Sequence, residues 1–590
     1  MDVRIDTAIF IRPIKKSLSC KAQMTKRWIS KIQPDKNIVE ELSKAINLNK
    51  VLTSILVQRG MDTFEKAKKF FRPQIADLHD PFLMKGMEQA INRIDEAIDK
   101  NQKILIYGDY DVDGTTAVAT VYSFLVERYP NIDFYIPDRY TEGYGISFMS
   151  IDWARNNAFS LIIALDCGIK SIDKVNYAKD QGIDFIICDH HLPGDEIPEA
   201  VAVLNPKQKD CTYPFKELSG CGIGYKLIQA YALRHEISPK EVERFLDLGA
   251  VSVASDLVPI LDENRVMAHY GLKRLKENPN NGLKALLEAY PEKPEYGVND
   301  IVFFIGPRIN AAGRIADAKD SVRLMTSAGE EEARKIAHQV NQHNNERRNF
   351  DQSITEHAFE LIAKDPDFVN RKSTILFHRE WHKGVIGIVA SRLIEKFYRP
   401  TIILTESNGM ATGSARSVEG FDLYSAIESC SDLLDQYGGH THAAGLTLKL
   451  ENLPLFIEKF EKVVAENIEH RSLTPEIEYD MEIDLRTITP KFFNVLKQFS
   501  PFGPGNHNPV FMSKNVWDVG DATIVGNNHL KLSLTQENGG RIFKAIAFGL
   551  GEHYEKVAQG ISFDICYTIE ENHFNGHVNL QLNIKDILFK

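Results

Sequence analysis

Residues 103–114 read KILIYGDYDVDG, and this stretch decides how the central part of the chain folds. A short, mostly apolar run leads directly into three aspartates spaced two apart, and a glycine closes the stretch. Carboxylates this close together repel one another unless a cation, a basic partner or water offsets their charge. The stretch therefore predicts a buried strand that ends in a charged loop.

An EF-hand calcium loop begins with the same spacing of aspartates. The twelfth position of such a loop is a bidentate Glu, whereas here it is Thr120, and the residues before the loop predict a strand. The sequence therefore argues against a calcium loop.

Further aliphatic runs follow in the region from 103 to 260, separated by helical stretches such as 116–128 and 171–181. The runs are IDFYIP (132–137), SLIIALDCG (160–168), IDFIICDHH (183–191) and AVAVLNP (200–206). This alternation is typical of an α/β domain whose parallel sheet is covered on both faces.

Polar residues that can bind metal follow the three best strands. They are Asp109, Asp111, Asp113, Asp166, Asp189, His190 and His191. One Asp after a strand is usually a helix N-cap or a turn residue. However, ligands gather at the carboxyl ends of parallel strands, and no local excess of Lys or Arg pairs with this set. The set therefore predicts a site for divalent metal.

The ligand types narrow the choice of metal. Many oxygen ligands with one or two imidazoles favour Mn²⁺, with Mg²⁺ as the alternative and Zn²⁺ less suited. One ion does not need this many ligands, so two divalent cations are expected. Two ions that share a bridging aspartate form a centre for phosphoryl transfer.

The rest of the chain predicts other elements. Residues 39–70 have a helical pattern, and 326–364 form one long polar helix that bridges two bodies. A second α/β region covers 373–448. Residues 561–584 alternate between apolar and polar around an Asn575-Gly576 turn, which predicts a β-hairpin within a small antiparallel, OB-like barrel. The apolar positions are Ile561, Phe563, Ile565, Tyr567, Ile569, Val578, Leu580, Leu582 and Ile584.

The composition is that of a globular protein with roughly three to five domains in 590 residues. The net charge of -11 does not by itself indicate a nucleic-acid binder, although basic groups can be local. There is no apolar run long enough for a membrane span and no signal-peptide core, and the scattered cysteines suit reduced, buried thiols. We therefore expect a cytoplasmic protein, with Met24 as an alternative start to Met1.

A series of motifs resembles the DHH phosphoesterase superfamily. The first four are GDYDVDG (108–114), LDCG (165–168), CDHH (188–191) and VSVASDLVP (251–259). The later ones are GPRINAAGR (306–314), GSARS (413–417), YGGHTHAAG (437–445) and FGPGNHNPVF (502–511). The full series, over about 75–590, is similar to the exonucleases of this superfamily that are specific for single-stranded DNA.

The resemblance implies a role for each residue that matches a motif. The implied metal ligands are Asp111, Asp113, Asp166, His190 and Asp256, and Asp109 is close enough in sequence to join them. The implied catalytic group is His191, as a general acid or charge stabiliser, with Asp113 and with Asp189 as an orienting partner. Asp256 depends on the resemblance alone, because the residues before it could form either helix or strand.

The resemblance also implies that Arg139, Ser414 and Arg416 bind the 5′-terminal phosphate. Guanidinium groups bind phosphate bidentately, which agrees with this role. The glycines of YGGHTHAAG let the backbone approach a phosphate closely beside His440, although turns also use glycines. The family resemblance favours Arg308 and Asn310 as site residues. Arg308 and Arg314 could contact the nucleotide backbone, or they could instead brace two lobes. His382 could face a phosphate at a helix start or could cap a turn.

The expected fold is α/β, with two α/β lobes, a parallel-sheet DHH domain and a DHH-associated domain, joined by a long helix and followed by an OB-like β-barrel. The expected domains are a helical segment (1–75), the catalytic domain (76–290), a connecting region (291–365), a substrate-binding domain (366–455) and an OB-like nucleic-acid-binding domain (456–590).

The expected activity is a metal-dependent 5′-to-3′ exonuclease that releases 5′-mononucleotides from single-stranded DNA in repair and recombination. The alternatives are an oligoribonucleotide or cyclic-dinucleotide phosphodiesterase and, in another class, a non-catalytic replication scaffold. The expected partners are single-stranded DNA, a helicase and a single-strand-binding protein, with the chain itself a monomer.

Overall fold

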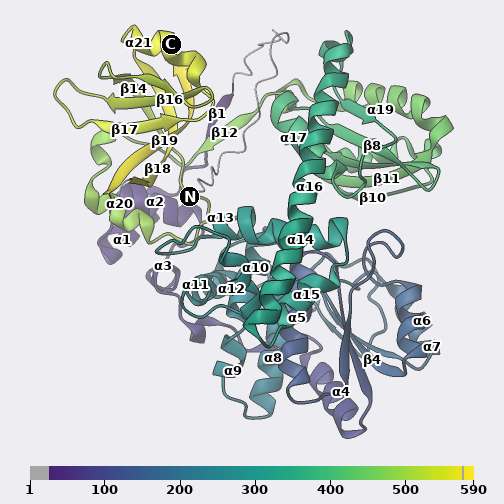
Figure 1. Ribbon diagram of the computed structural model, residues 1–590. Coiled ribbons are helices and arrows are strands. Elements are labelled where there is room, and N and C mark those ends of the chain that lie inside the picture. The colour runs from purple at the N-terminus through teal and green to yellow at the C-terminus, as the bar shows by residue number, and fades with distance from the viewer. Residues whose placement is uncertain (1–25, 575–576, 590) are drawn as a thin grey trace. The chain divides into compact units, whose positions relative to one another are not determined.

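The computed structural model describes residues 26–574 and 577–589. The expectations for Met1, Cys20, Met24 and the Asn575-Gly576 turn lie outside this part of the chain. The chain forms two compact units. One consists of the described residues up to Trp28 and of Asn349–Ile477, and the other begins with Ile29–Arg348 and continues from Glu478. Each unit is described by itself (Figure 1).

The second unit contains the predicted parallel sheet, in the strand order β3-β2-β4-β5-β6. Its strands are β2 (Lys103–Gly108), β3 (Ile132–Tyr135), β4 (Phe159–Leu165), β5 (Asp184–Cys188) and β6 (Ala202–Leu204). All neighbouring pairs are parallel, as predicted. All carboxyl ends therefore point to the same edge.

Helices cover both faces of this sheet, because the strands are apolar on both sides (Figure 1). One face packs against α4 (Met87–Asp99), α5 (Val112–Val126) and α8 (Gly220–Arg234), and the other packs against α6 (Phe148–Asn156) and α7 (Ile172–Asp180). Within β2, Ile104 and Ile106 face the first group, whereas Leu105 and Tyr107 face the second. Two-sided burial confirms the predicted architecture.

Helices after the sheet complete this domain. They are α9 (Lys240–Glu243), α10 (Leu246–Ser255), α11 (Asp262–Glu277), α12 (Asn281–Leu287), α13 (Val298–Asp300), a π-helical segment (Ile301–Ile305), α14 (Gly306–Ile315) and α15 (Lys319–Thr326). The segment before Asp256, which the sequence left open between helix and strand, is therefore helix α10.

The same unit holds the C-terminal sheet, in the order β13-β14-β18-β19-β17-β16-β15. Its strands are β13 (Met481–Glu482), β14 (Phe511–Asp518), β15 (Thr523–Val525), β16 (His529–Thr535), β17 (Phe543–Ala547), β18 (Phe563–Phe574) and β19 (His577–Phe589). An additional β14–β16 pairing closes a ring of five strands. The sheet is not wholly antiparallel as predicted, because β17–β19 and β13–β14 are parallel pairs.

The predicted hairpin is the antiparallel pair β18–β19. Phe563, Ile565 and Tyr567 are buried, but Asp564, Cys566 and Thr568 between them are buried as well, so this part of β18 is covered on both faces. Two of the apolar positions are exposed: Ile561, which precedes the strand, and Val578, at 54%.

Three N-terminal helices share a core with this sheet, which the sequence did not reveal. They are α1 (Lys36–Ile46), α2 (Lys50–Gln58) and α3 (Phe64–Phe71), and the short helix α20 (Pro490–Lys497) joins them. Leu52, Ile55 and Phe70 pack in one cluster with strand residues such as Phe511 and Phe563. Helices α1, α2 and α3 and the C-terminal strands are therefore parts of one folding body.

The first unit contains the second α/β region, a sheet of order β10-β11-β9-β8-β7. Its elements are β7 (Thr374–Phe377), α17 (Ile386–Phe397), β8 (Thr401–Ser407), β9 (Met410–Arg416), α18 (Leu423–Glu428), β10 (Gln436–His440), β11 (Ala443–Lys449) and α19 (Leu453–Asn467). Only β7–β8 is a parallel pair in this sheet. Helix α19 spans residue 455, where the sequence predicts a domain boundary, and packs in the core of this sheet.

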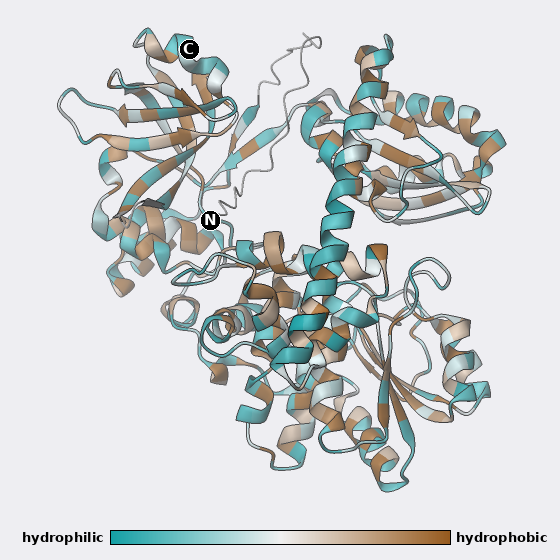
Figure 2. Cartoon of the chain, in the orientation of Figure 1, coloured by the Kyte–Doolittle hydropathy of each residue, from teal (hydrophilic) through white to brown (hydrophobic). Residues whose placement is uncertain are grey.

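A single helix of 35 residues, α16 (Glu330–Lys364), runs from the second unit into the first. It is hydrophilic over most of its length, as predicted (Figure 2). Within the described chain, β1 (Arg27–Ser30) and β12 (Glu476–Tyr479) form a separate two-stranded sheet. No described helix is long and apolar enough to cross a membrane. All six described cysteines are buried, and none of these six forms a disulfide.

Candidate active site

The three aspartates after β2 lie in a tight strand-to-helix connection. Helix α5 begins at Val112, four residues earlier than predicted, and the Asp111 carboxylate caps it by accepting the Gly114 N–H at 3.0 Å. A Cβ on Gly114 would lie 2.4 Å from the Asp109 carbonyl oxygen, so this turn requires glycine. A helix this close to the strand leaves no room for a twelve-residue calcium loop.

Asp113 is buried and is held by a second helix. Its Oδ2 accepts the Gly220 N–H and its Oδ1 accepts the Cys221 N–H, both at 2.7 Å, at the N-terminus of α8. The Ser252 hydroxyl, on α10, donates to Oδ1 at 2.7 Å. The helix N-terminus favours negative charge and fixes the carboxylate. Sequence reasoning missed these partners, although Ser219 before an apolar run is an N-cap signal.

Asp166 follows β4 in the left-handed backbone region, with φ of 60°. This conformation is uncommon for residues other than glycine, and Asp tolerates it better than most. A Cβ on Gly220 would lie 2.6 Å from the Cβ of Asp166. The first residue of α8 must therefore be glycine for Asp166 to keep its position.

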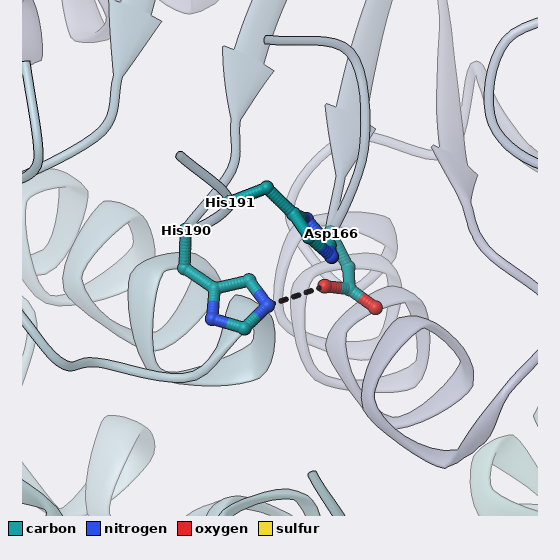
Figure 3. A group of neighbouring side chains, drawn as sticks. All are labelled: Asp166, His190 and His191. Carbon is teal, nitrogen blue, oxygen red and sulfur yellow. Dashed lines mark ion pairs between the residues drawn. The ribbon is translucent and has the colours of Figure 1, made fainter. Parts of the chain in front are cut away.

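His190 lies close to three aspartates, and its ion pair with Asp166 is drawn in Figure 3. Its Nε2 lies 3.1 Å from Asp166 Oδ1, 3.6 Å from Asp256 Oδ2 and 3.9 Å from Asp113 Oδ2. Two groups of side chains here could hold a metal ion, one with Asp166, His190 and His191 and one with Asp113, His190 and Asp256. Chain direction in the sheet and the C-terminus of α10 thus bring together residues from several separate segments of the chain.

Several potential ligand atoms at this edge make no hydrogen bond among the described residues, although Asp166 Oδ1 and His190 Nε2 form an ion pair with each other. These ligand atoms are Asp109 Oδ1, Asp166 Oδ1, Asp256 Oδ2 and Nε2 of His190, and all are buried. Buried polar atoms are normally satisfied, because an unpaired one costs about 1–3 kcal/mol. Carboxylate oxygens with an imidazole nitrogen are a donor set that Mn²⁺ and Mg²⁺ accept. The residues therefore fit a divalent cation.

The pKa values of the acidic groups show how unfavourable this cluster is without a cation. Burial, and then the charge of Asp111, raise the pKa of Asp109 to about 8. Burial and then Asp113 raise the pKa of Asp256 to about 8. The pKa of Asp166 is raised well above its usual value, again by burial first and then by neighbouring aspartates. Burial lowers the pKa of His190, which leaves the neutral imidazole that a metal requires.

His191 is oriented by Asp189. The ring Nδ1 lies 2.7 Å from Asp189 Oδ1, which also accepts the His191 backbone N–H at 3.1 Å. Burial lowers the pKa of His191, but the hydrogen bond and charge of Asp189 outweigh it and raise the pKa overall. Asp189 is itself held, because its Oδ2 accepts the Ile169 N–H at 2.9 Å. The predicted orienting contact is therefore present.

Arg139 lies beside the cluster, with its guanidinium 4.8 Å from the ring centre of Tyr110, and its charge offsets part of the rise that burial causes in the pKa of Asp109. The Arg314 carbonyl accepts the hydroxyl of Tyr140 in the same loop as Arg139. Helix α14 passes close to Tyr110, since a Cβ on Gly313 would lie 2.8 Å from the Tyr110 carbonyl oxygen.

Arg308 on α14 makes contacts that connect this helix to α16 and to the residues just before α14. Its Nε donates to Asn341 Oδ1 on α16 at 2.6 Å, and its Nη1 donates to the Phe304 carbonyl at 2.8 Å. The guanidinium also lies over the Phe304 ring at 3.5 Å. Asn310 is half-buried on α14.

The remaining predicted residues lie in the first unit. Ser414 and Arg416 are on β9, and the Arg416 Nη1 donates to Ser414 Oγ at 3.0 Å. His440 on β10 is in register with Ala443, which is in register with Arg416. A Cβ on Gly387, in the first turn of α17, would lie 2.8 Å from Ser414 Oγ. The start of α17, which the sequence analysis raised as a phosphate-facing helix start, therefore lies against Ser414.

His382 caps a turn, which is one of the two alternatives for this residue. Its Nδ1 accepts the Gly384 N–H at 3.1 Å, just before α17 begins. Its ring stacks on Phe350 at 4.9 Å.

Three family models match the chain. They are the DHH family N-terminal domain over residues 103–252, the DHHA1 domain over 370–466 and the RecJ OB domain over 479–586. The sheet with the acidic edge, the sheet with Ser414 and Arg416 and the C-terminal ring of strands correspond to these three matches.

Known proteins and solved structures that are similar to this chain over most of its length agree with the three family matches. The single-stranded-DNA-specific exonuclease RecJ of Bacillus subtilis is 38% identical, over 95% of this chain and 70% of its own length. The Escherichia coli protein of the same name is 31% identical over 85% of this chain and 90% of its own. The crystal structure of RecJ in complex with Mn²⁺ from Thermus thermophilus matches with a TM-score of 0.81 and 26% identity, over 95% of this chain and 79% of that one. The chain therefore belongs to the RecJ family of single-stranded-DNA-specific exonucleases.

Proposed function

We propose that the protein is a metal-dependent exonuclease that removes 5′-mononucleotides from single-stranded DNA in the 5′-to-3′ direction. The observation that carries this proposal is the cluster of buried carboxylates with unpaired oxygens around His190. A chain that only served as a scaffold would have no physical need for so much buried negative charge. Family membership supplies the substrate class.

Six side chains would hold two divalent cations at this edge. They are Asp109, Asp111, Asp113, Asp166, His190 and Asp256. When bound, such ions lower the pKa of water and offset the charge of a phosphate. Two relatives of known structure hold Mn²⁺, which supports Mn²⁺ here, and Mg²⁺ fits the same donors.

His191 would act on the scissile phosphate. Asp189 holds Nδ1, so the other ring nitrogen, Nε2, is the atom that can donate a proton or a hydrogen bond. The hydrogen bond and charge of Asp189 outweigh burial and raise the pKa of His191, and in its protonated form the ring would stabilise negative charge on phosphate oxygens and protonate the leaving 3′ oxygen.

The polarity would come from residues that bind the terminal phosphate. Arg139 lies beside the acidic cluster, and Ser414 and Arg416 lie beside the N-terminus of α17. Guanidinium, hydroxyl and helix N-terminus are all groups that bind phosphate. Arg308 and Asn310 have a weaker case, because Arg308 already braces α14 against α16.

The test uses oligonucleotides of single-stranded DNA with Mn²⁺. A 3′-labelled strand should shorten by one nucleotide at a time from its 5′ end, whereas blocking the 5′ end should stop digestion. Asp166→Asn should lower turnover at least about 100-fold, because it removes a metal-binding charge. The matched control Asp133→Asn changes an exposed acid on β3 and should leave turnover unchanged. Digestion from the 3′ end, or equal turnover of Asp166→Asn and wild type, would contradict the proposal.

The same assay separates the alternative substrates. A phosphodiesterase for short oligoribonucleotides or cyclic dinucleotides should prefer a dinucleotide to a long strand, whereas the proposed exonuclease should prefer the long strand. The C-terminal ring of strands favours the long strand, because such barrels are platforms for single-stranded nucleic acid.

We further propose that the protein acts in the cytoplasm in DNA repair and recombination, with a helicase and a single-strand-binding protein that supply its single strands. Buried cysteines without disulfides among the described residues support a reducing compartment.

A further inference from the structure

Tyr144 contacts His191 at the ring nitrogen that Asp189 leaves open. The Tyr144 hydroxyl lies 3.1 Å from His191 Nε2, within hydrogen-bond distance. The two rings meet edge to face with centroids 6.0 Å apart. Tyr144 is nevertheless 58% exposed, so most of its ring is not buried in a core. Burial of an aromatic side chain therefore does not explain its position.

The loop that carries Tyr144 is built to hold it in place. Tyr144 stands between two glycines in the left-handed region, Gly143 with φ of 86° and Gly145 with φ of 78°. Left-handed backbone on both sides turns the chain sharply around a single side chain, and glycine adopts it without steric cost. The Gly145 carbonyl accepts the buried Tyr107 hydroxyl at 2.7 Å, which ties the loop to β2.

Two acids fix the rest of the loop. The Asp138 carboxylate accepts the Tyr140 and Thr141 N–H groups at 2.9 Å and 2.8 Å. The Glu142 carboxylate accepts the Asp138 N–H at 2.9 Å and the Ser147 hydroxyl at 2.6 Å. A loop with this many internal hydrogen bonds holds its side chains in defined positions.

We propose that Tyr144 is a positioning residue for His191. Asp189 and Tyr144 contact the two ring nitrogens, at 2.7 Å and 3.1 Å, and together they fix the plane of the imidazole. A His held at one nitrogen alone can still rotate about its remaining torsions, whereas a second contact keeps the ring in one plane until a phosphate takes the place of the Tyr144 hydroxyl at Nε2. The proposal rests on the proposed function, since His191 acts there on the scissile phosphate. The sequence predicts a role for Arg139 of this loop but none for Tyr144.

The test compares Tyr144→Phe with wild type in the 5′-to-3′ digestion of single-stranded DNA with Mn²⁺. The change removes one hydroxyl from an exposed ring, so the fold and the melting temperature should be kept. The expected result is a kcat about three- to tenfold lower, the value of one hydrogen bond, with KM unchanged. The matched control Tyr129→Phe removes a hydroxyl that bonds the Gln102 carbonyl at 2.6 Å, outside the loop that holds Tyr144, and should leave kcat unchanged.

A double-mutant cycle shows whether Tyr144 acts through His191. In a His191→Ala background, Tyr144→Phe should have no further effect on the residual kcat, because the group that it positions is gone. An equal loss in both backgrounds, or an unchanged kcat for Tyr144→Phe, would overturn the inference. Failure of the proposed function is a separate outcome, in which wild type itself does not digest single-stranded DNA.

Discussion

At the scale of single residues, the active site depends on acids that are unfavourable in isolation. Asp109, Asp166 and Asp256 are removed from water and lie near one another, so the protonated forms are favoured in the absence of metal. The sequence predicted which strand-end acids would meet, because strand direction alone brings them to one edge. It could not predict Asp256 without the family resemblance, since an acid at the end of a helix has no such geometric rule.

Cation binding should therefore depend on pH. The pKa values of Asp109 and Asp256 are about 8, so both carboxyls must lose a proton before they bind Mn²⁺ at neutral pH. The apparent affinity for Mn²⁺ should rise up to about tenfold per pH unit for each proton released, and should level off above about pH 8. Calorimetric titration at pH values from about 6.5 to about 8.5 measures this, and Asp109→Asn should flatten the slope. A Mn²⁺ affinity that is constant over this pH range would contradict the predicted coupling of metal binding to proton release.

The raised pKa values of Asp109 and Asp256 also determine how the stability of the metal-free fold changes with pH. A carboxyl whose pKa is raised in the folded state stabilises the fold at low pH, and this contribution is lost as the pH rises through about 8. The metal-free protein should therefore lose stability as the pH rises from about 4, the usual pKa of a carboxyl, to about 8, with no further loss from these groups above that pH, and Mn²⁺ should restore stability near pH 8. Thermal melting with and without Mn²⁺ across this range measures the effect.

At the scale of elements, the start of helix α8 fixes two ligands at once. Its first N–H groups hold Asp113, and its first residue, Gly220, is in contact with Asp166. The sequence predicted the strands and helices of this domain well, because their apolar patterns are long. It did not predict this contact, because Gly220 lies 54 residues after Asp166 and only the folded chain brings them together.

Gly220→Ala should therefore impair the site more than the fold. The added Cβ would lie 2.6 Å from the Asp166 Cβ, and so Asp166 or the helix must shift. We expect turnover and Mn²⁺ affinity to fall about 10- to 100-fold, the range for displaced ligand support. Gly249→Ala on α10, where the nearest atom would be 3.9 Å away, is the matched control and should keep both. Equal Mn²⁺ affinity in the two variants would show that Asp166 tolerates the shift.

At the scale of the whole molecule, the second unit joins segments from both ends of the chain. The N-terminal helices share a core with the C-terminal strands. Local patterns could predict each of these parts, but not their packing, because nothing in an apolar helix identifies its partner. The helices also explain why the C-terminal domain should not be removed to test function, since its loss would expose Leu52, Ile55 and Phe70.

Arg265 on α11 connects this shared body to the catalytic domain. It is 3% exposed, and its guanidinium donates to the carbonyls of Phe70 at 2.8 Å, Phe499 at 3.1 Å and Ser500 at 2.8 Å. It also stacks on the Phe70 ring at 3.8 Å. One side chain thus satisfies carbonyls from segments more than 400 residues apart in sequence.

Arg265→Met should loosen this connection, because it leaves several buried carbonyls without a donor. We expect the free energy of unfolding to fall by about 3 kcal/mol or more, and the first melting transition to occur at a lower temperature. Proteolysis near Phe70 and Ser500 should be faster. The control Arg234→Met removes a partly exposed arginine that pairs with Glu88 and should change stability by less than about 1 kcal/mol. Hydrolysis of a dinucleotide, which needs only the metal cluster, should survive Arg265→Met better than digestion of a long strand. If both activities fell equally, or if melting were unchanged, Arg265 would not be the residue that connects the two bodies.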